Sequence, residues 1–313
     1  MNKTKLFFSL LIIPLLLSGC GPLAEPVGGD VEPFQPMMAL TSEPDSATPG
    51  DAPYRKSLHT AISYDGLTFI PTDEIISAQA HAPDAVTKDE DIYLYYSGWI
   101  VGNQINDIAL ALSEDEGQTW IHYNITIDEL PELSDPTHPD VLLLNDGTFR
   151  LYFSAHTWTQ SGIFYADSLD GINFVYQGVV GVDTETPLID STTHVINEAW
   201  YQYSIGDFVE EMYLFEGTED WLEFTGITSF PPNGILHRPI NGYWLNDKYQ
   251  LLMIEDETGI MRSMRTSNGT DWYAVDGERM NALNDGTSIT DATVVQLDNT
   301  YLMIYSRYQP DSE

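Results

Sequence analysis

The feature that most constrains this chain is a turn signature that returns about every fifty residues. Each copy combines a serine or glycine, an acidic or amide residue, a glycine or threonine, and a closing aromatic side chain. The closing aromatic residues are Phe69, Trp120, Phe174, Trp221 and Trp272. A fixed period of this length indicates a repeat architecture, and four short strands per period are typical of propeller blades.

A second signature, a strand–turn–strand unit, interleaves with the first. Its clearest copy covers residues 137–154, where an apolar run meets Asn145-Asp146-Gly147 and a second apolar run follows. Asp-Gly between two such runs predicts a β-hairpin, because these turns need positive φ angles. Further copies begin near Asp84, Thr193, His237 and Asp291.

The order of the two signatures predicts an all-β, five-bladed β-propeller over residues 53–313. The turn signature at Ser63 precedes the first inner strand, whereas the last inner strand, at Asp291, has no copy after it. Strands from residues 58–69 are therefore expected to join the last blade, so that the N-terminal strands close the ring. The predicted blades cover residues 81–124, 137–178, 190–225, 235–275 and 290–308, the last completed by the N-terminal strands.

The first nineteen residues have the pattern of a signal peptide. Lys3 and Lys5 precede an apolar stretch, residues 6–17, that is too short to span a bilayer. Residues 17–20, Leu-Ser-Gly-Cys, resemble a bacterial lipobox, which implies that Cys20 is lipidated and anchors the protein in the bacterial cell envelope, in the outer membrane of a Gram-negative cell. An ordinary secretory signal is the alternative. Cys20 is the only cysteine, so no intramolecular disulfide can form.

Residues 20–52 are predicted to be a flexible, acidic, proline-rich tether. This stretch is rich in Pro, Gly, Glu, Asp, Ser and Thr. It has too little apolar surface to order itself.

The net charge of the chain limits the classes of partner that it can bind. Forty-eight acidic residues against twelve Lys and Arg give a formal net charge of −36. Such a surface repels phosphates, which excludes nucleic acid and disfavours polyanionic glycans and anionic lipid headgroups. Contact with the membrane is expected only through Cys20, and the chain is expected to be a monomer.

Two family resemblances rest on these motifs. The Ser113–Trp120 turn resembles the Asp box of sialidases and other propellers, which is a folding device. The Pro-Asp pairs at 83–84 and 139–140, together with the count of five, resemble the five-bladed glycoside hydrolase superfamily of arabinanases, xylosidases and fructosidases. This resemblance implies that Asp84 is the general base or nucleophile and that Asp140 orients the acid.

The third inner strand departs from that family pattern. The family places a Glu at its start, but this chain has Asp190-Ser191-Thr192-Thr193-His194. Asp190 or His194 is then the candidate acid, since a few relatives are similar in using a histidine. A loop glutamate, Glu185 or Glu255, is an alternative, and loss of hydrolysis is another. Asp291, at the fifth inner strand, completes the set of candidate catalytic residues.

Other side chains near the inner strands are candidates for substrate binding. His81, His138, His237 and Arg238 precede or begin inner strands, and Trp99 and Trp158 follow second strands. These histidines could instead bond neighbouring strand ends, and the tryptophans could pack between blades. The histidines lie at different offsets from the aligned aspartates, so no metal site and no cofactor are predicted; a Ca²⁺ ion at the axis, as in some relatives, is the alternative.

The sequence thus favours a surface-tethered glycoside hydrolase-like protein that acts on a neutral oligo- or polysaccharide with carboxylates at the propeller axis. The missing glutamate leaves open whether the protein is an enzyme. The alternative is a non-catalytic propeller that binds a glycan or a protein. A sialidase is a third hypothesis, but it needs an arginine cluster to bind a carboxylate, and only Arg238 begins an inner strand.

Overall fold

A computed structural model gives the fold of the chain, and the predicted signal peptide, Cys20 and Trp158 lie outside its described part. The described residues are 31–40, 53–99, 106–131, 136–156, 161–180, 188–206, 212–219, 221–228, 237–255, 259–280 and 287–309.

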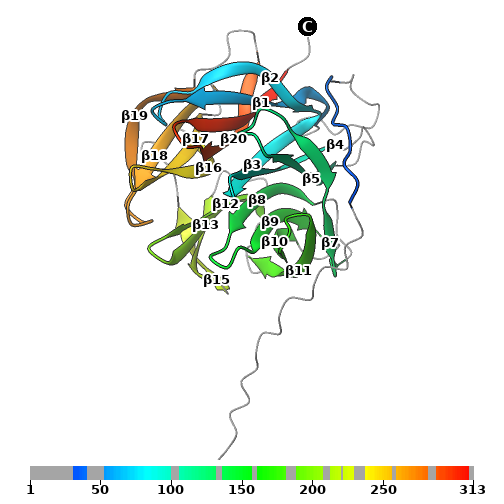
Figure 1. The fold of residues 1–313 in the computed structure, drawn as a ribbon. Helices are drawn as coiled ribbons and strands as arrows, with labels where there is room; N and C mark the ends of the chain where they lie inside the picture. The colour runs from blue at the N-terminus through cyan, green and yellow to red at the C-terminus, as the bar shows by residue number, and fades with distance from the viewer. Residues whose placement is uncertain are drawn as a thin grey trace, which may run out of the picture.

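The described residues form five antiparallel sheets arranged around one axis, which is a five-bladed propeller (Figure 1). Blade 1 contains β3 (Ala80–Lys88), β4 (Asp91–Trp99), β5 (Asn106–Ser113) and β6 (Ile121–Asn124). Blade 2 contains β8 (Thr137–Leu143), β9 (Phe149–His156), β10 (Ser161–Ser168) and β11 (Asn173–Val180), with the short β7 (Thr126–Asp128) parallel to β11.

Blades 3 and 4 repeat the same order. Blade 3 contains β12 (Leu188–Ile196), β13 (Ala199–Gly206), β14 (Met212–Thr218) and β15 (Trp221–Thr228). Blade 4 contains β16 (His237–Leu245), β17 (Lys248–Glu255), β18 (Ile260–Thr266) and β19 (Tyr273–Met280). The first strand of each blade is the inner one, so β3, β8, β12 and β16 lie nearest the axis.

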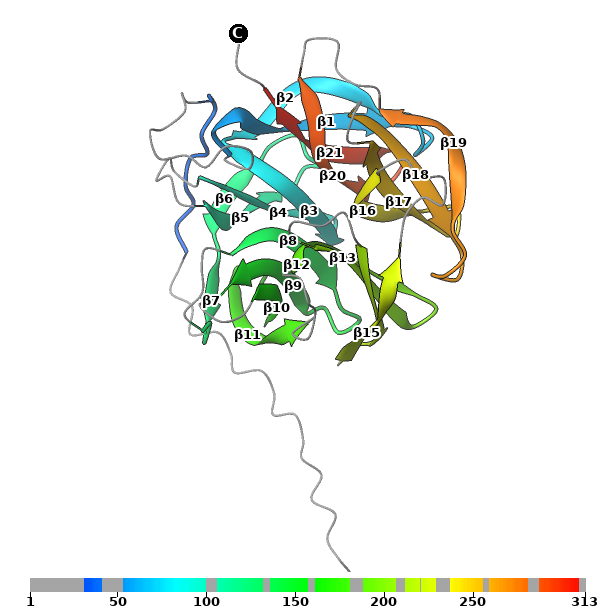
Figure 2. The ribbon, with the colours of Figure 1, turned by 180° about the vertical axis from the view of Figure 1, so that it is seen from behind.

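The fifth sheet joins strands from both ends of the described chain. Its order is β2 (Ile70–Ala78), β1 (Lys56–Ser63), β21 (Tyr301–Tyr308) and β20 (Ser288–Gln296). β1 pairs antiparallel with β21 along its whole length, with His59 opposite Tyr305 and Ala61 opposite Met303. Figure 2 shows these strands side by side at the edge of the ring. The only helical element in the described part is the 3-10 turn η1 (Pro53–Arg55).

The Asp-box signature forms a self-contained hydrogen-bonded turn. In blade 2, Asp170 Oδ1 accepts the backbone N–H groups of Ile172 and Asn173, and Ser168 Oγ accepts that of Gly171. Gly171 has a φ of 77°, which a side chain would strain. The hydroxyl of Tyr95 in blade 1 donates to the Gly171 carbonyl at 2.7 Å. The turn therefore also joins its blade to the preceding one.

The blade-4 turn has the same geometry with different residues. Thr266 Oγ1 accepts the Gly269 N–H, and Asn268 Oδ1 accepts those of Thr270 and Asp271. Thr266 and Asn268 thus have the roles that Ser168 and Asp170 have in blade 2.

The core is divided among the spaces between blades. One cluster joins blades 1 and 2 through Tyr95, Leu110, Phe149, Leu151 and Phe153, which are all fully buried. Alternation along each strand sends neighbouring side chains to opposite faces, so that each blade packs on two neighbours.

Part of the predicted tether lies against the propeller. The Phe34 N–H donates to the His122 carbonyl at 2.8 Å, and the Ala78 N–H on β2 donates to the Met37 carbonyl at 2.6 Å. The Phe34 ring packs on His122, with centroids 5.6 Å apart. Residues 31–40 therefore differ from the expected flexible tether, because Phe34 supplies an apolar contact that the surrounding composition lacks. Within the described part, no helix is long and apolar enough to cross a membrane.

Candidate functional site at the propeller axis

Five polar residues occupy the same level of the five inner strands. Each pairs with a residue in the middle of the second strand of its blade, as in Asp84 opposite Tyr95 and Asp140 opposite Tyr152. We call this set the axial ring: it consists of Asp84, Asp140, Thr193, Asn241 and Thr293.

Asp84 ties blade 1 to three other blades. Its Oδ2 accepts the backbone N–H of Val141 on β8 at 2.6 Å. Its Oδ1 accepts the Ala85 N–H at 2.7 Å and the Thr293 hydroxyl at 3.0 Å, and it also accepts Asn241 Nδ2. Both carboxylate oxygens are thus engaged within the ring, and only 5% of the residue is exposed.

Asp140 repeats this arrangement toward blade 3. Its Oδ1 accepts the Thr193 N–H at 3.1 Å. Its Oδ2 accepts the hydroxyls of Thr193 at 2.6 Å and Ser191 at 3.0 Å. Gln202 Nε2 in turn donates to Thr193 Oγ1 at 2.9 Å. Ser191 and Thr193 of the third inner strand thus both donate their hydroxyls to Asp140.

Burial controls the charge of the two aspartates. Removal from water raises the pKa of Asp84, and the nearby Asp140 carboxyl raises it further. Burial likewise raises the pKa of Asp140, against the opposing effect of its bonds from Thr193. Two close carboxyls in a dry site resist simultaneous ionisation, so the pair retains a proton more readily than exposed aspartates do.

The other two predicted carboxylates lie nearer the strand starts. Asp291 is buried and lies opposite Ser306, so Thr293, two residues later, shares the level of Asp84. A bulge between Ile289 and Asp291 shifts the register of β20. Asp190 is half-buried, has a φ of 56°, and donates its N–H to Ser154 Oγ at 2.8 Å.

His194 lies between blades 3 and 4. Its ring stacks on Tyr249 with centroids 4.5 Å apart, and on Tyr203 and Tyr201 at 5.4 and 5.6 Å. Neither ring nitrogen has a hydrogen-bond partner among the described residues. Burial lowers the pKa of His194 to about 3. The imidazole is therefore neutral near pH 7 and cannot donate a proton as an imidazolium.

Two predicted substrate-binding histidines meet where blades 1 and 2 begin. The rings of His81 and His138 contact edge to face, with centroids 5.3 Å apart. His138 has a φ of 52°, and its N–H donates to Ser97 Oγ at 2.7 Å. The hydrogen bond from the Asp190 N–H to Ser154 Oγ is the equivalent contact between blades 3 and 2. Each serine, on the second strand of one blade, thus binds the start of the inner strand of the next blade.

The remaining candidates separate into packed and undescribed residues. Trp99 is 7% exposed and stacks on Tyr54, with centroids 5.7 Å apart, so it packs in the fold instead of forming an open sugar platform. Trp158 and Glu185 lie outside the described residues, as do the side chains of His237 and Arg238 on β16. Glu255, at the end of β17, is half-buried.

The described residues contain no group of three or more His, Cys, Asp or Glu side chains placed to hold a metal ion. Sequence reasoning missed three members of the axial ring: Thr193, Asn241 and Thr293. The hairpin between the first and second strands of a blade fixes which residues pair across it. Counting outward from each hairpin turn would therefore have identified these three residues as the partners of the same position on the second strand.

Comparison with known proteins supports the fold. No family model and no curated protein matches the chain. Among solved structures, a thermostable family-43 glycoside hydrolase is similar with a TM-score of 0.58 and 16% identity, covering 74% of this chain and 91% of that one. An α-L-arabinofuranosidase from Clostridium thermocellum has a TM-score of 0.54 and 17% identity, covering 72% and 81%.

A family 117 glycoside hydrolase from the marine bacterium Zobellia galactanivorans is similar with a TM-score of 0.50 and 14% identity, covering 74% of this chain and 84% of that one. The chain therefore has the five-bladed β-propeller fold, and its structural neighbours include glycoside hydrolases of families 43 and 117.

Proposed function

We propose that this protein is a glycan-binding propeller in which the axial aspartates stabilise the fold instead of hydrolysing a glycosidic bond. The observation that carries the proposal is the bonding of Asp84, whose two carboxylate oxygens accept bonds from Val141, Ala85, Thr293 and Asn241. These bonds fix the carboxylate within the fold and occupy most of its acceptor capacity, whereas a general base must be free to turn an oxygen toward the attacking water.

The candidates for the general acid also support a non-catalytic protein. The start of the third inner strand, residues 190–194, contains no glutamate, and the Ser191 hydroxyl donates to Asp140. His194 is buried among tyrosines and neutral. Hydrolysis by inversion or retention needs a second carboxyl group at a set distance from the first, and neither of these residues supplies one.

The ligand class follows from the fold neighbours and from the charge. Solved neighbours are described as an arabinofuranosidase and a xylosidase bound to xylotriose. The net charge of −36 favours a neutral glycan over an anionic one. We place the glycan at the face where the inner strands begin, near His81 and His138, and anchor the protein in the cell envelope through lipidated Cys20.

A hydrolase acting on the same neutral glycans is the second candidate. The raised pKa values of the Asp84 and Asp140 carboxyls favour it, because a carboxyl that stays protonated can act as a general acid.

Alanine substitution of Asp84 separates the two candidates. Asp84→Ala leaves the Val141 N–H, Asn241 and Thr293 without their acceptor, so it should lower the free energy of unfolding by about 2–5 kcal/mol. Asp298→Ala, at an exposed hairpin turn, is the matched control and should change stability little. Denaturant unfolding measures both variants.

Activity is measured on the wild type with a panel of neutral oligosaccharides and aryl glycosides. Binding by calorimetry without turnover is the expected result. Turnover that Asp84→Ala abolishes while the unfolding midpoint is unchanged would establish the hydrolase.

A further inference from the structure

On the hairpin-turn side of the axial ring the structure has an open cavity of about 400 Å³. All five inner strands line it. We call it the turn-side channel. It lies on the side of the ring away from the strand starts, so it is separate from the face proposed above for the glycan.

The channel has a buried floor and an open mouth. Asp84, Thr193 and Asn241 of the axial ring form the floor and are buried. Thr87 and Gln296 at the other end are exposed, and Trp244 is 44% exposed. A cavity of this volume with one closed polar end has the size and form of a small-molecule site.

One wall of the channel is aromatic. Trp244 meets Tyr249 edge to face, with centroids 5.7 Å apart, and Tyr249 stacks on His194. Aliphatic side chains, including Val86 and Val294, line the remaining walls. Trp244 is the exposed ring of this wall, whereas Tyr249 behind it is 5% exposed.

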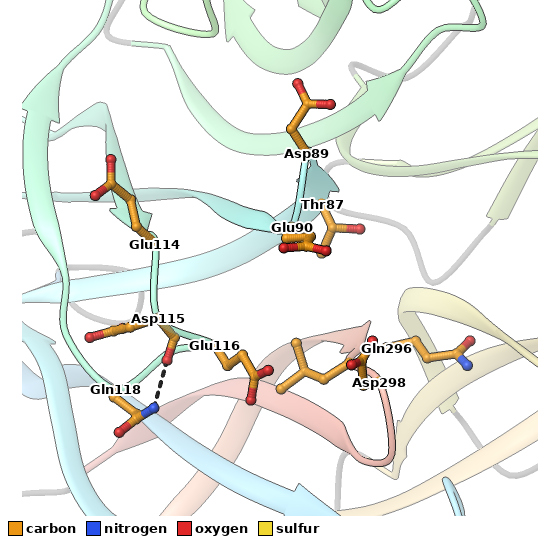
Figure 3. A pocket seen from close by; sticks show the side chains of 10 residues that line it. Thr87, Asp89, Glu90, Glu114, Asp115, Glu116, Gln118, Gln296 and Asp298 are labelled. Atoms are coloured by element: carbon orange, nitrogen blue, oxygen red, sulfur yellow. Dashed lines mark hydrogen bonds between the residues drawn. The ribbon is translucent and has the colours of Figure 1, made fainter.

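A strongly acidic hollow adjoins the mouth. It has a volume of about 870 Å³ and shares Thr87 and Gln296 with the channel. Figure 3 shows its side chains on the turns of blades 1 and 5. Six carboxylates line it: Asp89, Glu90, Glu114, Asp115, Glu116 and Asp298. Among the described residues that line this hollow there is no Lys or Arg, so its potential is negative.

We propose that the turn-side channel binds a small organic ammonium ion with an apolar body, of the quaternary ammonium class. The acidic hollow attracts the cation, and the exposed ring of Trp244, which packs on Tyr249, stabilises it by cation–π contact once it leaves water. The aliphatic walls accept its methyl groups. A strongly hydrated inorganic cation fits poorly, because the described residues converge in no metal-ligating group.

Calorimetric titration of the full-length protein in detergent with choline tests this site. The comparison ligand is dimethylbutanol, the neutral isostere in which carbon replaces the ammonium nitrogen. Choline should bind one to one and about tenfold or more tighter than the isostere, a factor within the range of a desolvated cation–π contact. Raising the salt to about 0.5 M should weaken choline binding, since exposed carboxylates are then screened.

Two variants locate the site. Trp244→Ala should weaken choline binding about tenfold. Tyr273→Ala removes another exposed aromatic ring of blade 4, on β19 outside the channel, and should bind as the wild type does. Thermal unfolding checks that both variants are folded.

Equal affinity for choline and its isostere, no choline binding, or full binding by folded Trp244→Ala would each overturn the proposal. The glycan proposal is tested separately, because Trp244→Ala should leave glycan binding at the opposite face unchanged.

Discussion

The junction between blades 1 and 2 and the junction between blades 3 and 4 are built from different chemistry. At the first, Phe149, Leu151 and Phe153 are fully buried in one apolar cluster, and Asp84 binds a backbone N–H of the next inner strand. At the second, the equivalent of Asp84 is Thr193, and the contact surface is a stack of tyrosines on His194.

This difference shows how a repeat fold tolerates divergence. Each blade packs only on its neighbours, so the junction of blades 3 and 4 can lack a carboxylate and a large apolar core while the junction of blades 1 and 2 has both. At the junction of blades 3 and 4, hydrogen bonds from aromatic side chains partly take the place of apolar contacts. The Tyr201 hydroxyl donates to the Asn268 carbonyl, and Trp272 Nε1 donates to the Tyr203 hydroxyl. The junction of blades 3 and 4 should therefore be the weaker one.

The largest expected effect is a core truncation at the stronger junction. Phe149→Ala removes a fully buried ring that lies 4.7 Å from the Tyr93 ring, centroid to centroid, and should cost about 3–5 kcal/mol of unfolding free energy. Tyr201→Ala at the weaker junction should cost less, about 1–3 kcal/mol, because its surroundings contain groups that water can solvate. Equal losses in urea unfolding would remove the distinction between the junctions.

The two junctions should also respond to pH in opposite directions. Folding lowers the pKa of His194 to about 3. Its contribution to stability is therefore present above the unfolded value near 6.5 and is lost as the pH falls toward 3. Folding raises the pKa of Asp84, so its contribution is present at low pH and is lost as the pH rises past its unfolded value.

His194→Phe keeps the aromatic stack and removes the titrating group. Between pH 6.5 and 5, the variant should lose roughly 1–2 kcal/mol less stability than the wild type. His59 and His122, whose pKa values burial also lowers to about 4, remain in both proteins and supply the shared acid response. Parallel pH profiles of the two proteins in denaturant unfolding would show that His194 does not titrate on folding.

The smallest expected effect compares two Asp-box turns. Asp170→Ala in blade 2 removes a carboxylate that accepts two backbone N–H groups, and should cost about 1–2 kcal/mol. Asn268→Ala in blade 4 removes a neutral acceptor with the same geometry and should cost about half as much.

Acid should narrow this difference, since the pKa of Asp170 is lowered by its bonds and the stability they give is lost as the pH falls. Thermal unfolding at neutral and acidic pH measures both variants. A constant gap across that range would contradict a charge-based origin.

The candidate site was only partly readable from the sequence. Asp84 and Asp140 were identified because each follows a proline at the start of an apolar strand. The sequence grouped Asp291 and His194 with these two aspartates because each lies near the start of an inner strand. The strand pairing instead puts Thr293 and Thr193 at the same level as Asp84 and Asp140. Pairing with the second strand sets which side chain reaches this level, and position along the inner strand alone does not reveal that pairing.

The sequence by itself determined the period, the hairpins, the Asp-box turns and the count of five blades, because these depend on residues that are close in the chain. Only the tertiary structure decided that the partners of Asp84 come from β8, β16 and β20, up to 209 positions away. Tertiary structure also placed Trp244, Tyr249 and His194 along one channel. Such contacts depend on ring closure and strand register, which local sequence preferences do not encode.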